Sequence, residues 1–106
     1  MLMRLAIFEG TVRPGQAAAF RAYVNERLAP LWRKFDGAEE VRVLFGAERD
    51  AKAPEIALIL AITYPDKDAM ARALASPARY ESRDLLPELF EHYFDGRMHH
   101  HVMTVE

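Results

Sequence analysis

The stretch Glu55-Ile56-Ala57-Leu58-Ile59-Leu60-Ala61-Ile62-Thr63-Tyr64 decides the fold of this chain. Its almost unbroken apolar run predicts a strand that is buried on both faces. The polar residues 48–54 precede this run and include a proline. They therefore predict a hairpin connection from a preceding strand, residues 39–47.

Both strands of this hairpin are apolar on two faces. One face carries Val41, Val43, Phe45, Ile56, Leu58, Leu60 and Ile62, and the other still carries Leu44, Ala57, Ile59 and Ala61. Helices can cover only one face of such a sheet, so the second face needs another cover. We expect a second copy of the chain to provide it by packing sheet against sheet about a twofold axis. Two alternatives stay open: the facing is shifted by one residue in some strand, or the segment after Ser76 covers this face.

The sequence before the hairpin predicts a strand over residues 4–12 and a helix from Gln16. The helix has an apolar stripe at helical spacing, formed by Phe20, Tyr23, Val24, Leu28, Leu31, Trp32 and Phe35. Pro30 lies within the stripe and removes one backbone hydrogen bond, so it predicts a bend in one continuous helix. Asp36-Gly37 predicts the end of this helix.

After the hairpin, Asp66 is a good N-cap for a second helix, which Ser76-Pro77 interrupts. A further helix is expected to reach about Phe94, with Pro87 in its first turns. Asp95-Gly96 is expected to close that helix, and residues 97–105 to form a last strand. In this interpretation Phe94-Asp95-Gly96 weakly repeats Phe35-Asp36-Gly37.

The element order is therefore β-α-β-β-α-β. It predicts one α+β domain over residues 1–106, a ferredoxin-like fold with a four-stranded antiparallel sheet that forms a dimeric α/β barrel. The absence of cysteine excludes disulfides, thiolate metal sites and cysteine nucleophiles, and a cytoplasmic protein is expected. A net charge of −2 without a basic patch predicts no nucleic-acid partner. No apolar run approaches the ~20 residues of a membrane span, so no membrane partner is predicted.

Short motifs in the chain resemble the dimeric α/β-barrel superfamily, and most of all the EthD-like (ether-degradation-associated) family. They are Phe20-Arg21-Ala22-Tyr23, Leu28-Ala29-Pro30-Leu31 and Phe94-Asp95-Gly96. The resemblance implies a homodimer with a pocket between the sheet and its helices. The superfamily is also similar in fold to polyketide-type monooxygenases, muconolactone isomerase, haem-degrading enzymes and stress-responsive barrels. EthD-like proteins often have a histidine before Ala-Pro-Leu, and this chain has Leu28 there.

The run His99-His100-His101 is the most conspicuous candidate for chemistry. In a strand, His99 and His101 point to one face and His100 to the other. We predict His99 and His101 as catalytic acid or base groups and His100 as a substrate-binding residue. The alternative is that these histidines are hydrogen-bonded structural residues or lie exposed near the edge of the dimer. Two imidazoles at this spacing can also reach one metal ion, with Glu9 or His92 as a third ligand, but no metal site is predicted.

Five further residues are predicted to bind substrate, in the implied pocket or beside it. Tyr23, Trp32 and Tyr93 combine an apolar ring with a polar group, and Arg42 and Arg97 are cations within strand patterns. The two arginines have a structural alternative, in which they form salt bridges with Glu9 and Glu40. The aromatic residues have one too, because aromatic side chains at helical spacing are usually part of the core. The charged residues that follow Pro77 either form a solvated helical face or line the entrance of the pocket; they are Arg79, Glu81, Arg83 and Asp84.

No cofactor fingerprint or phosphate-binding loop is present, so no cofactor is predicted. The function predicted from the resemblance is a small-molecule enzyme or accessory protein. It would oxygenate or isomerise an aromatic or carbonyl compound in an apolar pocket. The alternatives are a non-catalytic module that binds a small hydrophobic ligand and a stress-related dimeric structural protein.

Overall fold

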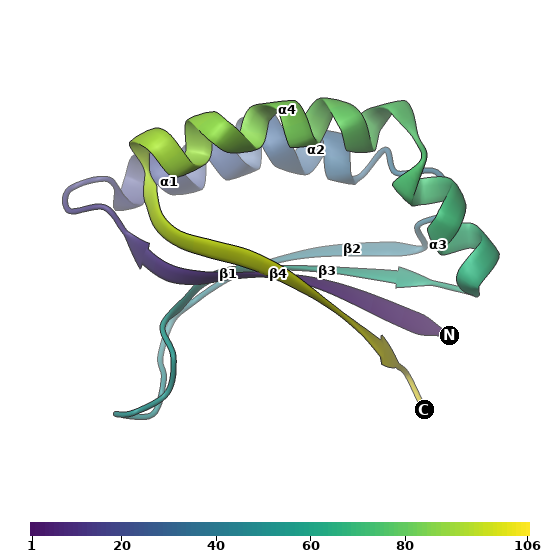
Figure 1. Cartoon of the computed structure of the whole chain (residues 1–106), viewed down its shortest axis with the longest axis horizontal. Coiled ribbons are helices and arrows are strands. Elements are labelled where there is room, and N and C mark those ends of the chain that lie inside the picture. Colours follow the sequence, from purple (N-terminus) through teal and green to yellow (C-terminus); the bar gives the residue numbers. More distant parts are fainter.

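In the computed structural model, which describes residues 1–106, the helices lie on one face of a single antiparallel sheet (Figure 1). The sheet has the order β2-β3-β1-β4. Its strands are β1 (Leu2–Val12), β2 (Glu40–Phe45), β3 (Ile56–Tyr64) and β4 (Phe94–Thr104). This topology confirms the ferredoxin-like fold class, and it places the apolar run of residues 55–64 in the inner strand β3.

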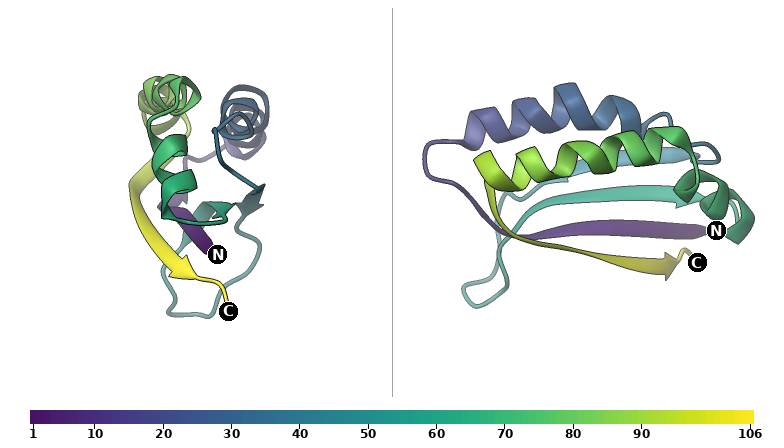
Figure 2. Two further views of the ribbon diagram at one scale, coloured as in Figure 1. Left: turned by 90° about the vertical axis from the view of Figure 1, so that its right-hand side faces the viewer. Right: turned by 45° about the horizontal axis from the view of Figure 1, so that its top comes forward.

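The first helical region is a single rod made of α1 (Ala17–Tyr23), η1 (Val24–Leu28) and α2 (Ala29–Trp32), as Figure 2 shows. The disturbance predicted at Pro30 takes the form of a π-helical turn immediately before it. There the N–H of Ala29 donates to the carbonyl of Val24, five residues back. Because Pro30 has no N–H and its ring crowds the preceding turn, a wider turn accommodates it without breaking the rod.

The second helical region consists of α3 (Lys67–Leu74) and α4 (Pro77–His92). Asp66 caps α3 as predicted, since its carboxylate accepts the N–H of Ala69 at 2.9 Å. Pro87 was expected in the first turns of the last helix, but it lies well inside α4. The helix tolerates Pro87 at an exposed position, where it removes one backbone hydrogen bond.

The boundary between α4 and β4 differs from the prediction. β4 begins at Phe94, and Asp95 and Gly96 pair with Thr11 and Gly10 of β1 instead of closing a helix. The first helical region ends at Trp32, before the predicted Asp36-Gly37, and Gly37 lies in a separate turn with a φ of +94°. The two Phe-Asp-Gly segments are therefore not structurally equivalent. Figure 1 shows β1 and β4 curving together toward the helices at this end.

The main core lies between the sheet and the helices, and its alternation follows the prediction for β2 and β3. Residues on the helix-covered face include Ala6, Phe8, Val41, Val43, Leu58, Leu60 and Ile62. Both helical rods lie on this face, so the segment after Ser76 does not cover the other one (Figures 1 and 2).

The uncovered side of the sheet, here called the open face, remains largely apolar. The register of the strands places Met3, Leu5, Ile7, Leu44, Ile59 and Ala61 on it. Leu44 is 48% exposed there. The hairpin connection of residues 46–55 projects beyond the sheet toward the same side (Figure 1). No helix of the chain has the length and apolar character needed to cross a membrane.

Candidate functional site

The register of β4 against β1 places the three histidines on two faces. His100 is opposite Ala6 on the helix-covered face, whereas His99 and His101 are opposite Ile7 and Leu5 on the open face. The alternation of the run is therefore as predicted. His100 is thus the histidine on the same face of the sheet as the helices, at the exposed edge strand β4.

A cavity of about 370 Å³ lies between the sheet and the helices, at the level of His100. The sheet contributes Arg4, Ala6, Phe8, Leu60, Ile62, Met98 and His100, and the helical side contributes Trp32, Phe35, Arg79, Ser82, Arg83 and Leu86. Its wall is mostly apolar, with a few polar groups directed to the same space. Sites that bind small molecules typically have this composition.

Trp32 and His100 are the two predicted binding residues that the structure brings together in this cavity. Trp32 is the only tryptophan of the chain and is 3% exposed. Its indole N–H donates no hydrogen bond to the protein. A ligand acceptor in the cavity would give this N–H a partner.

The electrostatics of the cavity are set by cations. Partial burial, then the positive charges of Arg4 and Arg79, and then His99 lower the pKa of His100 to about 4. His100 is nevertheless one of the exposed residues of the chain, because β4 is an edge strand. His100 is therefore neutral near pH 7, with one ring nitrogen free to accept a hydrogen bond or a proton.

Tyr23 and Tyr93 lie outside this cavity and pack against each other, with ring centroids 5.4 Å apart. The hydroxyl of Tyr23 donates to the carbonyl of Leu85 at 2.7 Å. Burial, together with Glu88, raises the pKa of Tyr23 to about 12. Tyr23 thus joins α1 to α4 in the core. Leu28, where EthD-like proteins often have a histidine, is also completely buried.

The other predicted site residues lie on the open face. Arg97 Nη2 lies 3.5 Å from Glu9 Oε2, and Arg42 Nε donates to Glu40 Oε1. The two arginines therefore pair with Glu9 and Glu40, the carboxylates that the sequence offered as an alternative to substrate binding. The rings of His99 and His101 are 5.4 Å apart beside Glu9. No group of three or more histidine, aspartate or glutamate side chains is arranged to hold a metal ion.

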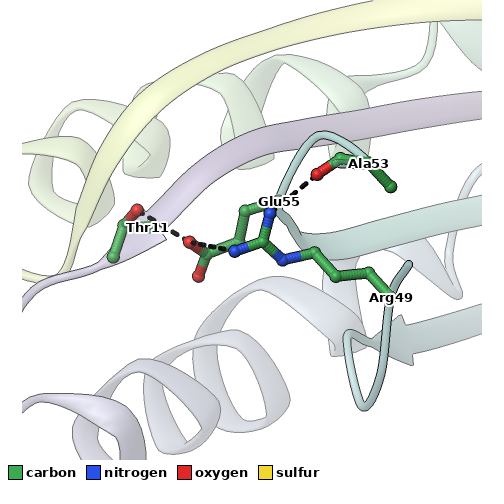
Figure 3. A network of polar contacts seen from close by, with 4 residues as sticks. All are labelled: Thr11, Arg49, Ala53 and Glu55. Carbon is green, nitrogen blue, oxygen red and sulfur yellow. Dashed lines mark hydrogen bonds and ion pairs between the residues drawn. The ribbon is translucent and has the colours of Figure 1, made fainter. Parts of the chain in front are cut away.

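A larger and more open hollow of about 790 Å³ lies between the start of α1 and residues 44–57. Figure 3 shows polar contacts at its edge. Thr11 Oγ1 donates to Glu55 Oε1 at 3.0 Å, Arg49 Nη2 lies 3.8 Å from the same oxygen, and Arg49 Nη1 donates to the carbonyl of Ala53 at 2.7 Å. These groups satisfy one another and hold the hairpin connection to β1, so the hollow is a weaker candidate than the cavity.

Sequence reasoning did not single out Arg4, although its position in β1 carried a signal. Arg4 alternates in phase with Ala6 and Phe8, so it had to share their buried face. The residues of α4 carried a second signal, because Arg79, Ser82, Arg83 and Leu86 follow a helical spacing of three and four. Of the two alternatives given for the charged residues after Pro77, Arg79 and Arg83 follow the second, because both line the cavity.

Comparisons with solved structures support the fold. An EthD family protein from Bacillus halodurans superposes with a TM-score of 0.77 at 17% sequence identity, covering 100% of this chain and 99% of the other. A putative antibiotic biosynthesis monooxygenase from Bordetella bronchiseptica has a TM-score of 0.62 at 23% identity, covering 99% and 97%. SnoaB, a cofactor-independent oxygenase from Streptomyces nogalater, has a TM-score of 0.61 at 22% identity, covering 98% and 91%.

No family profile and no curated protein matches the sequence. The structural likenesses cover the whole chain at low identity, so they show its fold. They confirm that the chain has the fold of EthD proteins and of antibiotic biosynthesis monooxygenases, as the sequence motifs predicted.

Proposed function

We propose that this chain is a small-molecule enzyme that takes an aromatic or carbonyl compound into the cavity beside His100. The observation that carries the proposal is the convergence of Trp32, Arg4, Arg79 and His100 on one cavity between sheet and helices. The names of two similar structures, an antibiotic biosynthesis monooxygenase and a cofactor-independent oxygenase, support chemistry of the oxygenation class.

In this proposal, some residues of the cavity bind the substrate and others transfer a proton or stabilise charge. Trp32, Phe8 and Met98 offer an apolar surface for a ring. The neutral imidazole of His100 takes a proton from an acidic C–H or O–H of the bound compound. The guanidinium groups of Arg4 and Arg79 stabilise the enolate or phenolate that remains. Since the negative charge forms next to His100, it raises the pKa of the imidazole at the moment when the proton arrives.

The resulting anion has two possible fates. Reprotonation at another carbon completes an isomerisation and needs no oxidant. Alternatively, dioxygen that enters the cavity adds to the carbanion through a new C–O bond, and the imidazolium returns its proton to the peroxide, which gives a hydroperoxide. The chain supplies the same groups to both reactions, so the test must monitor both.

A screen of enolisable dicarbonyl compounds and polycyclic phenols tests this proposal, with dioxygen consumption and absorbance changes as readouts. We expect His100→Gln to lower turnover of an active compound by about 10²-fold or more, the usual contribution of a general base. His92→Gln is the matched control, because His92 is exposed on α4 outside the cavity. Unchanged turnover in His100→Gln would refute the role of this histidine.

A non-catalytic binding module is the second candidate, and the low pKa of His100 favours it. An imidazole whose pKa is about 4 is a weak base as long as the cavity is empty. Compounds that bind beside Trp32 without being consumed under air or under nitrogen would identify this function.

We propose further that the protein is a homodimer, with the open faces of two copies packed together. An apolar sheet face with a 48% exposed Leu44 is a typical protein–protein contact. In this arrangement His99 and His101 serve the interface instead of the catalytic role predicted for them. Sedimentation analysis at micromolar concentration tests the assembly, and a monomer there would overturn it.

A further inference from the structure

The cavity beside His100 contains positive charge without any carboxylate. Its polar lining consists of Arg4, Arg79, Ser82, Arg83 and His100, and no aspartate or glutamate lines it. The chain as a whole has more acidic than basic residues, 16 against 14. The excess of cations at this place is therefore a local feature and not a consequence of composition.

These arginines have no anionic partner elsewhere in the chain. The five ion pairs of the structure involve other cations, namely Arg42, Arg49, Arg72, Arg97 and His99. Arg79 donates one hydrogen bond, from Nη1 to the carbonyl of Leu74 at 3.1 Å. Arg4 is half-buried on the helix-covered face and donates none.

A partly buried guanidinium without a partner is costly, and a second cation beside it adds to the cost. Burial, and after it the charge of Arg79, lowers the pKa of Arg4. The same two arginines act on His100. The three groups therefore lie within electrostatic reach of one another, and one negative charge between them would relieve all three repulsions.

The rest of the cavity restricts which anion fits. Phe8, Trp32, Leu60, Ile62 and Met98 make most of its wall apolar, and the volume of about 370 Å³ is larger than a simple inorganic anion needs. An arginine presents a planar fork that matches a carboxylate. A guest with an acidic group and an apolar body would satisfy both parts of the wall.

We propose that the ligand of this cavity is a small organic acid, whose carboxylate lies between Arg4 and Arg79 and whose apolar body packs against Trp32. The inference rests on the proposed function, which makes this cavity the ligand site, and it names the class of compound. The neutral His100 then lies beside the carboxylate end, where it can donate or accept a hydrogen bond.

A matched pair of probes tests the inference, namely 2-naphthoate and its neutral amide 2-naphthamide. Trp32 provides the readout, because a chain with one tryptophan gives a single indole N–H resonance and this indole lines the cavity. Titrating each compound into the protein while following that resonance gives two dissociation constants. We expect naphthoate to bind about tenfold more tightly than naphthamide, since charge-assisted hydrogen bonds are stronger than neutral ones.

Variants then assign the difference to particular residues. Arg4→Gln and Arg79→Gln should each weaken naphthoate binding by about tenfold and leave naphthamide binding within about twofold. Arg33→Gln is the matched control, because Arg33 is exposed after α2, lines no cavity and loses the same charge. Retained naphthamide binding also shows that each variant is folded.

The possible failures are distinguishable. Equal affinities of the wild type for both probes would overturn the organic-acid inference and leave the cavity as a ligand site. The organic-acid inference would also be overturned if Arg4→Gln and Arg79→Gln weakened naphthoate binding no more than Arg33→Gln does. An indole resonance that neither probe shifts would overturn the proposed ligand site, and the inference would fall with it.

Discussion

The carboxylate of Glu9 connects to two side chains of β4, because its Oε1 lies 3.4 Å from Nε2 of His99 and its Oε2 lies 3.5 Å from Nη2 of Arg97. The three residues lie on the open face, next to the apolar residues of β1. Nε2 of His99 is inaccessible to solvent and forms no hydrogen bond of normal geometry. In the proposed dimer this cluster lies in the interface, so its charges matter more to assembly than to the fold of one subunit.

Glu9→Gln is expected to weaken the dimer while changing subunit stability little. Exposed ion pairs contribute about 0–1 kcal/mol to folding, so the urea midpoint of the subunit should move slightly. Removing one partner from a buried charge pair costs more, and we expect the dimer dissociation constant to rise by about tenfold or more. Sedimentation over a dilution series measures it, with Glu91→Gln on α4 as the control. Equal dissociation constants for the two variants would contradict the expectation.

Leu44→Asp is expected to give a folded monomer. Leu44 is 48% exposed on β2, so the single subunit loses little packing when it is replaced, whereas the dimer must bury the new carboxylate without a partner. Tyr80→Asp is a suitable control, because Tyr80 is 50% exposed on α4, away from the open face. Sedimentation and circular dichroism together measure the outcome. A dimeric Leu44→Asp protein with native affinity would place the interface elsewhere.

The sheet was the most predictable part of the fold, because its signal is local and repetitive. Alternation fixed the facing of Val41, Val43 and Phe45, and the apolar run fixed β3 as an inner strand. The end of α4 was predicted less well, since Asp95-Gly96 is a common helix terminator in sequence. Pairing with β1 decides that boundary in the structure, and such long-range pairing leaves no local signal.

The candidate site could be predicted only in part, for a similar reason. Trp32 and His100 were singled out from the type of residue, and both line the cavity. Tyr23 had the same properties as Trp32, but only the packing of α1 on α4 shows that its hydroxyl is already bonded to Leu85. The cationic character of the cavity depends on Arg4 and Arg79, which are far apart in sequence and come together only through the tertiary fold.

Gly10→Ala is expected to destabilise the protein strongly, because β1 and β4 approach closely there. A Cβ on Gly10 would lie 2.3 Å from the carbonyl oxygen of Asp95, and its φ of +148° is unfavourable for other residues. We expect a loss of about 2–4 kcal/mol in the free energy of unfolding from the clash and the strain together. Gly15→Ala is the control: its φ is +77° but nothing lies within 4 Å of the added carbon, so about 1 kcal/mol is expected. Urea unfolding compares the two, and equal losses would refute the close approach.

Tyr23→Phe should reduce stability without affecting ligand binding. The substitution removes the 2.7 Å hydrogen bond that the hydroxyl donates to the carbonyl of Leu85, which costs about 0.5–1.5 kcal/mol. Because Tyr23 lines neither hollow, naphthoate should shift the indole resonance of Trp32 with wild-type affinity. Urea unfolding and the same titration measure the two effects. If the variant had wild-type stability but bound naphthoate more weakly, Tyr23 would instead have the substrate-binding role predicted from the sequence.

His100 should make the stability of the protein depend on pH in a defined window. Its pKa is about 4 in the folded chain and 6.5 for an ordinary histidine, so between these values the unfolded chain binds more protons than the folded one. The free energy of unfolding therefore falls as the pH is lowered from about 6.5 to about 4, and this contribution is fully present above 6.5. His100→Gln should flatten that part of the profile relative to the wild type. Bound naphthoate should raise the pKa of His100, since its carboxylate offsets the charges of Arg4 and Arg79. Following the imidazole C–H resonance of His100 against pH, with and without naphthoate, measures both values. A titration near 6.5 in the free protein would show that the arginines and burial do not act on His100 as the structure indicates.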